Sequence, residues 1–139
     1  MHLIGVWALS AALSLATAQD GAGAQQFDLI CEGSAQRSLD GPEEPRAYRL
    51  RIDLASGRYC WSDCVATFAI QEVAPDHLIL SSENVDTYRE RVFGESRISR
   101  ATGVHDELSI RSRPAPGRYY RSRATCTKGD FTGFPATLF

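Results

Sequence analysis

Apolar and polar residues alternate over several short stretches of the chain. The clearest stretch is residues 46–54, in which every second position from residue 48 on carries an apolar side chain and the positions between residues 48 and 54 are charged. The apolar set is Tyr48, Leu50, Ile52 and Leu54. A period of two places one set on each face of a β-strand. This stretch therefore predicts a strand with one face in the core and one face in water.

Turn signals divide the remaining chain into further short strands. Gly and Pro residues mark turns at residues 55–57, 74–76 and 114–117. The other predicted strands cover residues 27–32, 58–61, 67–73, 77–82 and 119–127, with one more around Leu108 and Ile110. A polar loop is predicted over residues 33–45, and an irregular cover over residues 131–139. Residues 87–100 predict two short strands or one bulged strand, because their apolar positions do not alternate cleanly.

This arrangement predicts an all-β fold. About eight to nine short strands with tight turns between them are typical of a small antiparallel up-and-down β-barrel or a β-sandwich. Helical periodicity is not found. A meander of this length tends to close on itself, because closure removes exposed sheet edges. The first and last strands then become neighbours.

The start of the chain predicts export. An apolar run over residues 3–15 precedes the small-x-small triplet Ala16-Thr17-Ala18, and this order is typical of a cleaved signal peptide over residues 1–18. The run is shorter than the roughly 20 apolar residues that span a membrane, and no later segment is long enough. We expect a flexible leader at residues 19–26, a single β domain at residues 27–139, no transmembrane segment, and a periplasmic or secreted location.

The four cysteines predict two disulfide bonds. An even count in a small exported chain favours a disulfide framework. Closure of the meander favours pairing Cys31 with Cys126, which leaves Cys60 with Cys64 as a local clip. A zinc site is disfavoured, because the spacing of Cys60 and Cys64 lacks the usual two-residue gap. We expect no metal and no cofactor.

No catalytic signature is found in the sequence. His105 stands beside two acids, Asp106 and Glu107, but neighbours on a strand point to opposite faces, so we interpret them as a polar strand entry. The sequence holds no paired carboxylates of a glycosidase, no phosphate loop, no zincin helix and no dinucleotide fingerprint. We therefore expect a protein that is not an enzyme.

Charge is close to balanced overall but changes sign along the chain. Residues 19–86 hold 5 basic and 12 acidic residues, whereas residues 87–139 hold 10 basic and 5 acidic. In the hairpin around residues 114–117, a register that sets Ile110 opposite Tyr120 gathers basic and aromatic side chains on one outer face. The candidate ligand-binding residues are Arg111, Arg113, Tyr119, Arg121 and Arg123. Guanidinium forks beside an aromatic ring suit phosphates, sulfates or carboxylates.

Several segments of the chain carry a resemblance to a known family: residues 27–31, 48–54, 58–60, 98–103 and 131–135, together with Cys64 and Cys126. They resemble a family of small exported, periplasmic bacterial β-rich proteins whose activity is not known. It extends over nearly the whole predicted domain. It implies the β fold and the compartment, and it carries over no functional residues.

Two shorter segments resemble bacterial inhibitors of C-type lysozyme, which are small exported β-barrels. Residues 56–59 read Ser-Gly-Arg-Tyr, and residues 127–130 read Thr-Lys-Gly-Asp, like the two inhibitory loops of that family. In the family the two motifs lie close together in sequence, whereas here most of the domain separates them. Arg123 also stands where the family has a tyrosine.

Two function classes remain. The first is a non-enzymatic binding module of the bacterial envelope, which uses the barrel mouth or the Arg-rich face for a small anionic ligand, a glycan or an envelope protein. The alternative is an inhibitor or accessory protein of the lysozyme-inhibitor type, which acts through exposed loops. We expect a monomer and no nucleic-acid partner.

Overall fold

A computed structural model describes residues 25–136 of the chain, and its regular elements are all strands. They are β1 (Gln26–Gln36), β2 (Glu43–Asp53), β3 (Arg58–Trp61), β4 (Phe68–Ala69), β5 (Glu72–Val73), β6 (His77–Asp86), β7 (Arg91–Ser99), β8 (Val104–Arg113) and β9 (Arg118–Gly129). The predicted signal peptide and most of the predicted leader lie outside the described residues, and Gln26 is the first residue of β1. Within residues 25–136, no helical segment is long and apolar enough to cross a membrane.

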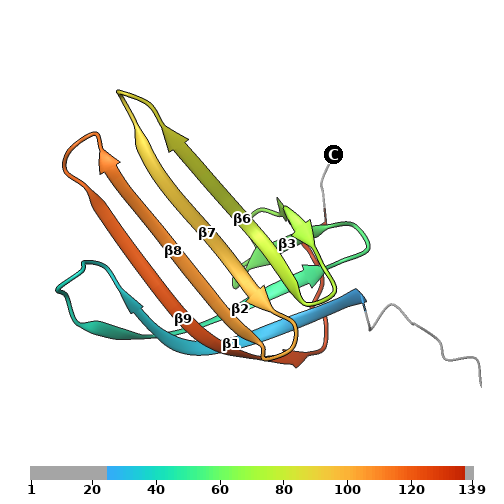
Figure 1. Cartoon of the computed structure of the whole chain (residues 1–139). Coiled ribbons are helices and arrows are strands. Elements are labelled where there is room, and N and C mark those ends of the chain that lie inside the picture. Colours follow the sequence, from blue (N-terminus) through green and yellow to red (C-terminus); the bar gives the residue numbers. More distant parts are fainter. Residues whose placement is uncertain (1–24, 137–139) are drawn as a thin grey trace, which may run out of the picture.

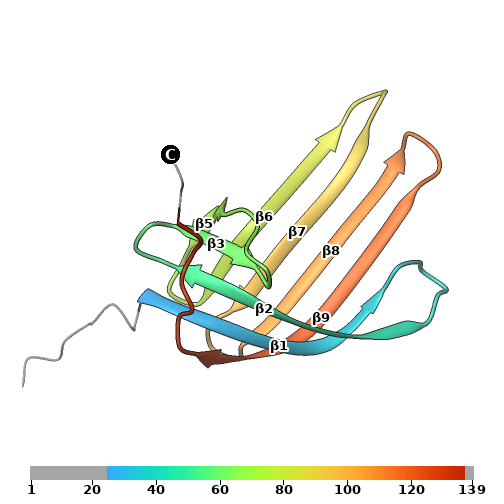
Figure 2. The same ribbon diagram turned by 180° about the vertical axis from the view of Figure 1, so that it is seen from behind.

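The nine strands form one antiparallel sheet in the order β4-β3-β2-β1-β9-β8-β7-β6-β5. The sheet curls into a half-barrel, with β6, β7, β8 and β9 as one wall and the hairpin of β1 and β2 as the other (Figures 1 and 2). The first long strand and the last pair with each other, as a closing meander requires. The predicted antiparallel β fold is therefore confirmed, in the form of one curled sheet.

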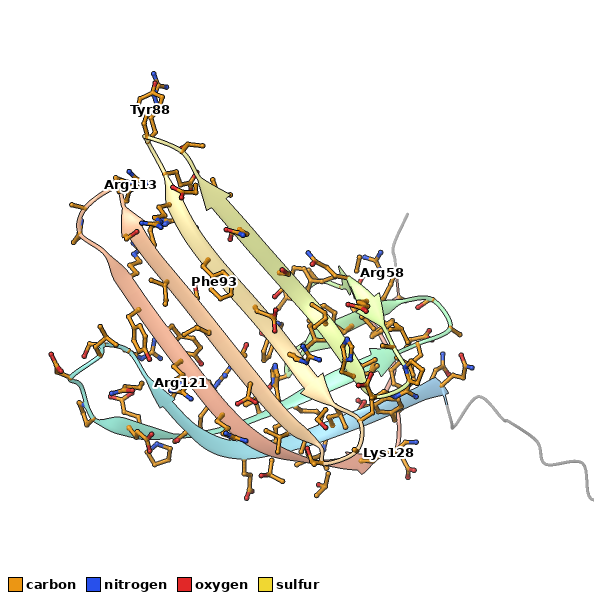
Figure 3. All side chains as sticks on the ribbon, viewed as in Figure 1. Arg58, Tyr88, Phe93, Arg113, Arg121 and Lys128 are labelled. Atoms are coloured by element: carbon orange, nitrogen blue, oxygen red, sulfur yellow. A yellow bond between two sulfur atoms is a disulfide. The ribbon has the colours of Figure 1, made fainter. Side chains whose placement is uncertain are left out.

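The half-barrel is closed at one end only. β4 pairs with β3 at one edge of the sheet, and β5 pairs with β6 at the other. Ile70 and Gln71 join β4 to β5. The Ile70 amide donates to Gly57 O at 2.8 Å, and the Gln71 amide donates to Ile79 O at 2.9 Å. This single short segment thus connects both sheet edges. At the other end the hairpins separate, and Tyr88 and Arg113 lie at or near their tips (Figure 3).

The hydrophobic core fills the closed end on the concave face. Its buried aliphatic members include Leu29, Leu50, Ile52, Leu78, Leu80 and Ile98. The predicted core face of β2 is confirmed, because Leu50 and Ile52 are fully buried while Tyr48 and Leu54 pack against the core from its margin. Burying one such aliphatic side chain contributes about 1.5 to 3 kcal/mol.

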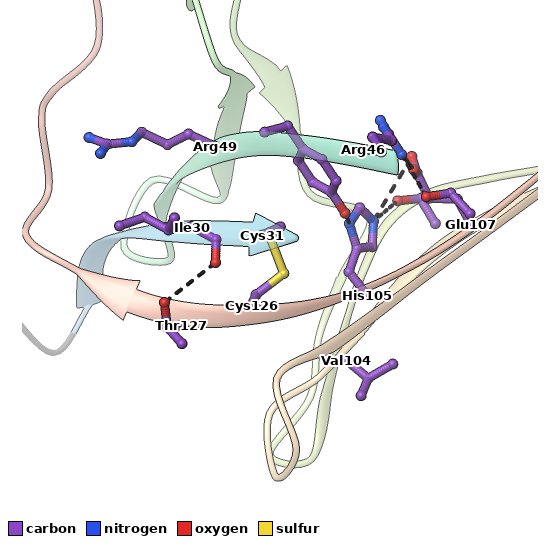
Figure 4. Close-up of a disulfide and its surroundings, with 12 residues drawn as sticks. Ile30, Cys31, Arg46, Arg49, Val104, His105, Glu107, Cys126 and Thr127 are labelled. Carbon is purple, nitrogen blue, oxygen red and sulfur yellow. Dashed lines mark hydrogen bonds and ion pairs between the residues drawn. A yellow bond between two sulfur atoms is a disulfide. The ribbon is translucent and has the colours of Figure 1, made fainter. Parts of the chain in front are cut away.

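Both predicted disulfides are present. Cys31 and Cys126 lie directly opposite each other on β1 and β9, with their Cα atoms 4.0 Å apart (Figure 4). Cys60 and Cys64 close a local loop after β3, with a Cα to Cα distance of 5.0 Å. The first bond joins the beginning of the fold to its end, because its cysteines are 95 residues apart.

The loop predicted over residues 33–45 is mostly strand. β1 and β2 continue their ladder to the pair Gln36 and Glu43, which leaves a connection of only six residues, 37–42. These outer parts of the two strands project beyond the core, where most side chains meet water on both faces. Ala35 is the one buried residue among them, so they carry no apolar alternation and the pattern that reveals other strands is missing here.

The uncertain stretch over residues 87–100 contains one strand. β7 runs from Arg91 to Ser99, and its register with β8 shifts between Arg91 and Val92. A second irregularity lies on β6 between Ile79 and Ser81. Such bulges place an extra residue on one strand and reverse the faces of the residues that follow.

The C-terminal segment packs back over the convex side of β1. Thr132 donates two hydrogen bonds to the Asp28 carboxylate, at 3.2 Å from its amide and 2.7 Å from its hydroxyl. Arg51 Nη1 donates to Gly133 O at 2.9 Å. The expected irregular cover is thus present over residues 131–136, and residues 137–139 lie outside the described part.

Candidate functional site

The register of β8 and β9 differs by one residue from the predicted one. Ile110 lies opposite Tyr119, and Glu107 lies opposite Ser122. The predicted pairs were Ile110 with Tyr120 and Glu107 with Arg123. A shift of one residue moves a whole set of side chains to the other face of a strand. The predicted patch is therefore divided between the two faces of the sheet.

Three of the five predicted site residues lie on the convex face. Tyr119, Arg121 and Arg123 line a shallow depression there together with Phe93, Leu108 and Ile110. Figure 3 labels Phe93 on β7 and Arg121 on β9. Arg123 Nε lies 3.6 Å from an oxygen of Asp106. Arg111 lies on the concave face, opposite Arg118, and Arg113 lies beyond the register shift at the end of β8, so the structure does not bring the five residues together.

The floor of the concave face, next to the core, holds a caged arginine. The Arg46 guanidinium lies over the rings of Tyr48 at 4.2 Å, Trp61 at 5.4 Å and Tyr120 at 5.6 Å. Its Nη1 atom forms an ion pair with Glu107 and donates to Ser122 Oγ at 2.9 Å. Cation and ring interactions of this kind, with the ion pair, fix the guanidinium in place.

His105 lies directly beside this cage (Figure 4) and is 0% exposed. Its Nδ1 is 2.6 Å from the Tyr48 hydroxyl, and its Nε2 is 2.7 Å from Ser96 Oγ. Burial, together with the positive charge of Arg46, lowers the pKa of His105 to about 4. Burial also raises the pKa of the Tyr48 phenol. At neutral pH the imidazole is therefore uncharged and the phenol is protonated, so each can hydrogen-bond to the other.

The Ser96 and His105 pair resembles the start of a nucleophile and base arrangement. Ser96 is only 5% exposed and His105 is not exposed at all, so no substrate atom reaches either group in this conformation. Among the described residues, one group of potential metal ligands comes close together, namely Cys31, His105 and Cys126. Both of its sulfurs belong to the disulfide. This cluster therefore stabilises the fold.

Sequence reasoning missed this network because it treated residues 105–107 as a polar strand entry. His105 and Glu107 are two positions apart and thus share one face, which is the concave one. Arg46 was unnoticed at the start of the alternating run that did predict β2. One signal in the sequence could have revealed the network: beyond the apolar part of a strand, the same inward alternation continues with polar residues.

A groove opens at the mouth of the half-barrel, between the loop joining β1 to β2 and the hairpin of β8 and β9. Its volume is about 780 Å³. The basic lining residues are Arg37, Arg111 and Arg118, the aromatic ones are Tyr119 and Tyr120, and no acidic residue lines it. The Arg37 guanidinium lies 5.9 Å from the Tyr120 ring centre, on which Arg46 also packs. The mouth groove is thus continuous with the caged floor.

Arg111 and Arg118 lie directly opposite each other on β8 and β9. Like charges in a directly opposed pair destabilise a sheet unless they are neutralised. Glu90 lies 3.8 Å from Arg111, and among the described residues no ion pair is found for Arg118.

A second opposed arginine pair in the same sheet shows the neutralised case. Arg91 and Arg113 lie opposite each other on β7 and β8, and the Asp86 carboxylate lies 3.7 Å from Arg91 and 2.8 Å from Arg113. One carboxylate therefore bridges both guanidinium groups. The pair of Arg111 and Arg118 has no such bridging acid within the described chain.

The two segments that resemble lysozyme-inhibitor loops lie at the closed end. Residues 56–59 form the turn into β3, and Tyr59 is only 6% exposed. Residues 127–130 end β9, and Lys128 lies 4.8 Å from the ring centre of Phe27. Strands β1 and β2 separate the two segments in the sheet.

In comparisons with known proteins, no protein-family model, no curated protein and no solved structure matches this chain.

Proposed function

We propose that this protein is a non-enzymatic binding module that holds an anionic saccharide in the mouth groove. The observation that carries the proposal is the opposed pair of Arg111 and Arg118, with Arg37 on the facing loop. A carboxylate or sulfate placed between the two opposed guanidinium groups would play the part that Asp86 plays for Arg91 and Arg113. Hydrogen bonds between a guanidinium group and an anion are roughly twice as strong as hydrogen bonds between neutral groups.

The rest of the groove suits a sugar ring. Tyr120 offers an aromatic surface on the concave side, and Ser109, which lies opposite it, offers a hydroxyl. Pockets that combine aromatic walls with a few polar groups are typical of small-ligand sites. Two disulfides support an oxidising compartment, where the anionic glycans of a bacterial envelope are available.

Calorimetric titration with a sulfated disaccharide tests the proposal. It is run at about 0.01 M and about 0.15 M salt, where the Debye lengths are about 30 Å and about 8 Å. We expect the Arg37→Ser, Arg118→Ser double variant to bind at least about tenfold more weakly, because it loses two charge-assisted contacts. The unsulfated disaccharide is the matched ligand control.

The Arg121→Ser, Arg123→Ser double variant is the matched protein control. It removes the same charge from the convex face, so we expect its affinity to match that of the native protein. Equal weakening in both double variants would show that only general charge matters. Weakening in the convex-face variant alone would move the site to the depression around Phe93. Either result would contradict binding at the mouth.

A further inference from the structure

The outer edge of β6 is a second surface of interest. β5 pairs only with Leu78 and Ile79 of this strand. From Leu80 to Asp86, no strand within the described residues pairs with the side of β6 that faces away from β7. Figures 1 and 2 show this half of β6 standing free beside the opening of the half-barrel. Unpaired strand edges are templates for pairing with another chain.

The direction of the backbone groups on this edge follows from one hydrogen bond. Gln71 Nε2 donates to Ser82 O at 3.2 Å, so the Ser82 carbonyl points away from β7. Backbone groups repeat with a period of two along a strand, and the register with β7 is regular from Ser81 to Asp86. The amide and carbonyl groups of Asn84 and Asp86 therefore also point outward.

The edge of β2 beyond β3 provides a contrast. Its Arg49 amide donates to Ser62 Oγ at 3.1 Å, so this edge is capped there. Four positions earlier stands Pro45, which has no amide hydrogen to offer a partner. Proline and side-chain caps are common protections of exposed edges. The outer edge of β6 has one side-chain contact, from Gln71 to the Ser82 carbonyl, but it has no proline between Leu80 and Asp86.

We propose that the free edge of β6 binds an extended basic peptide segment of a partner protein, which adds to the sheet as a further antiparallel or parallel strand. This is the strand-addition mode of peptide recognition, in which main-chain hydrogen bonds give affinity and alternate side chains give specificity. Six residue steps from Leu80 to Asp86 span about 20 Å at about 3.3 Å per residue.

The charge of the edge selects the partner. Glu83 lies two positions from Ser81, which is opposite the buried Ser96, so Glu83 belongs to the concave alternation. It is exposed, and among the described residues no ion pair is found for it. A lysine or arginine on the added strand would pair with this carboxylate. A second copy of this chain, aligned antiparallel about Glu83, would instead oppose two carboxylates, which disfavours self-association.

Binding of synthetic peptides tests the proposal, with a capped peptide of about seven residues that alternates lysine and valine as the probe. Two controls are matched to it: the same peptide with alternate backbone nitrogens methylated, and a peptide that alternates glutamate and valine. We expect both controls to bind at least about tenfold more weakly, because the first loses main-chain hydrogen bonds and the second opposes Glu83. The Glu83→Lys variant should reverse the preference between lysine and glutamate peptides.

The Asn84→Pro variant removes an outward amide that the ladder with β7 does not use, so it should lose peptide binding at least about tenfold while its unfolding midpoint changes little. If this variant does not fold, the N-methylated peptide still tests whether main-chain hydrogen bonds hold the peptide on the edge. Equal binding of the methylated peptide, no binding of the lysine peptide, or dimerisation through this edge would each overturn the proposal. The Arg37→Ser, Arg118→Ser variant should bind the peptide normally, which keeps the two sites distinguishable.

Discussion

Lowering the pH should destabilise the fold through His105. The side chain is 0% exposed, and its pKa is about 4 against an ordinary value of 6.5, because burial and then the charge of Arg46 disfavour the imidazolium. Between these two values the unfolded chain binds a proton that the folded protein does not. The contribution of His105 to the free energy of unfolding is therefore complete above about pH 6.5, and it is lost as the pH falls toward about 4.

The magnitude follows from the difference between the two pKa values. At about 1.4 kcal/mol per unit of pKa, the difference corresponds to about 3 kcal/mol of stability. Urea unfolding at a series of pH values from about 7.5 to about 4.5 measures this loss. This pH range lies above 3.8, the ordinary pKa of Asp53. Hydrogen bonds from Gln26, Ser56 and Ala55 outweigh burial and lower the pKa of Asp53, so its contribution is lost only below that window.

His105→Gln is the variant that tests the cause, because glutamine can hydrogen-bond within the network but does not titrate. It should be less stable at neutral pH, and its free energy of unfolding should depend far less on pH over the same range. A native profile that is flat between about pH 6.5 and about pH 4.5 would refute the reasoning.

Three further predictions concern the core, the disulfides and one glycine. Ile52→Ala should lower the free energy of unfolding by about 2 to 5 kcal/mol, because Ile52 is fully buried, whereas the exposed control Arg97→Ala should change it by at most about 0.5 kcal/mol; similar losses would reject the core assignment. Replacing both Cys31 and Cys126 by serine should lower the free energy of unfolding by about 4 to 5 kcal/mol, because the bond closes a loop of 95 residues. The same change at Cys60 and Cys64, which are 4 residues apart, should lower it by about 2 kcal/mol, and equal losses in chemical denaturation would contradict this. Gly33→Ala should cost about 1 to 3 kcal/mol, because its methyl group would overlap the Arg123 carbonyl across the ladder, and an unchanged melting temperature would show that β1 and β9 are not so close.

The fold could be predicted from the sequence wherever burial imposes a pattern. The alternation from Tyr48 to Leu54 identified β2 because Leu50 and Ile52 pack in the core. The pairing of Cys31 with Cys126 followed from closure of a meander, which brings β1 beside β9. The outer parts of β1 and β2 were missed, because hydrogen bonds alone extend that ladder to Gln36 and Glu43.

The candidate site was harder to predict, because apolar residues do not always point inward in a half-barrel. Leu108 and Ile110 share the convex face with Tyr119 and Arg121, although they look like core residues in the sequence. The inward positions in the first part of β8 are polar instead, as His105 and Glu107 show. In this part of the sheet the apolar residues do not all point inward. The hydrophobic pattern therefore gave no guide to the register of β8 and β9.

Mapping of amide chemical shifts by NMR, during titration with the sulfated disaccharide at low salt, tests the central claim most directly. The mouth groove predicts that the shifts concentrate at residues 37–39, 109–111 and 118–120, which line it. The amides of Asp106 and Phe93, which border the convex depression, should remain unchanged. Shifts that concentrate at Asp106, Phe93 and Arg123, or that spread evenly over all arginines, would contradict a binding site at the mouth.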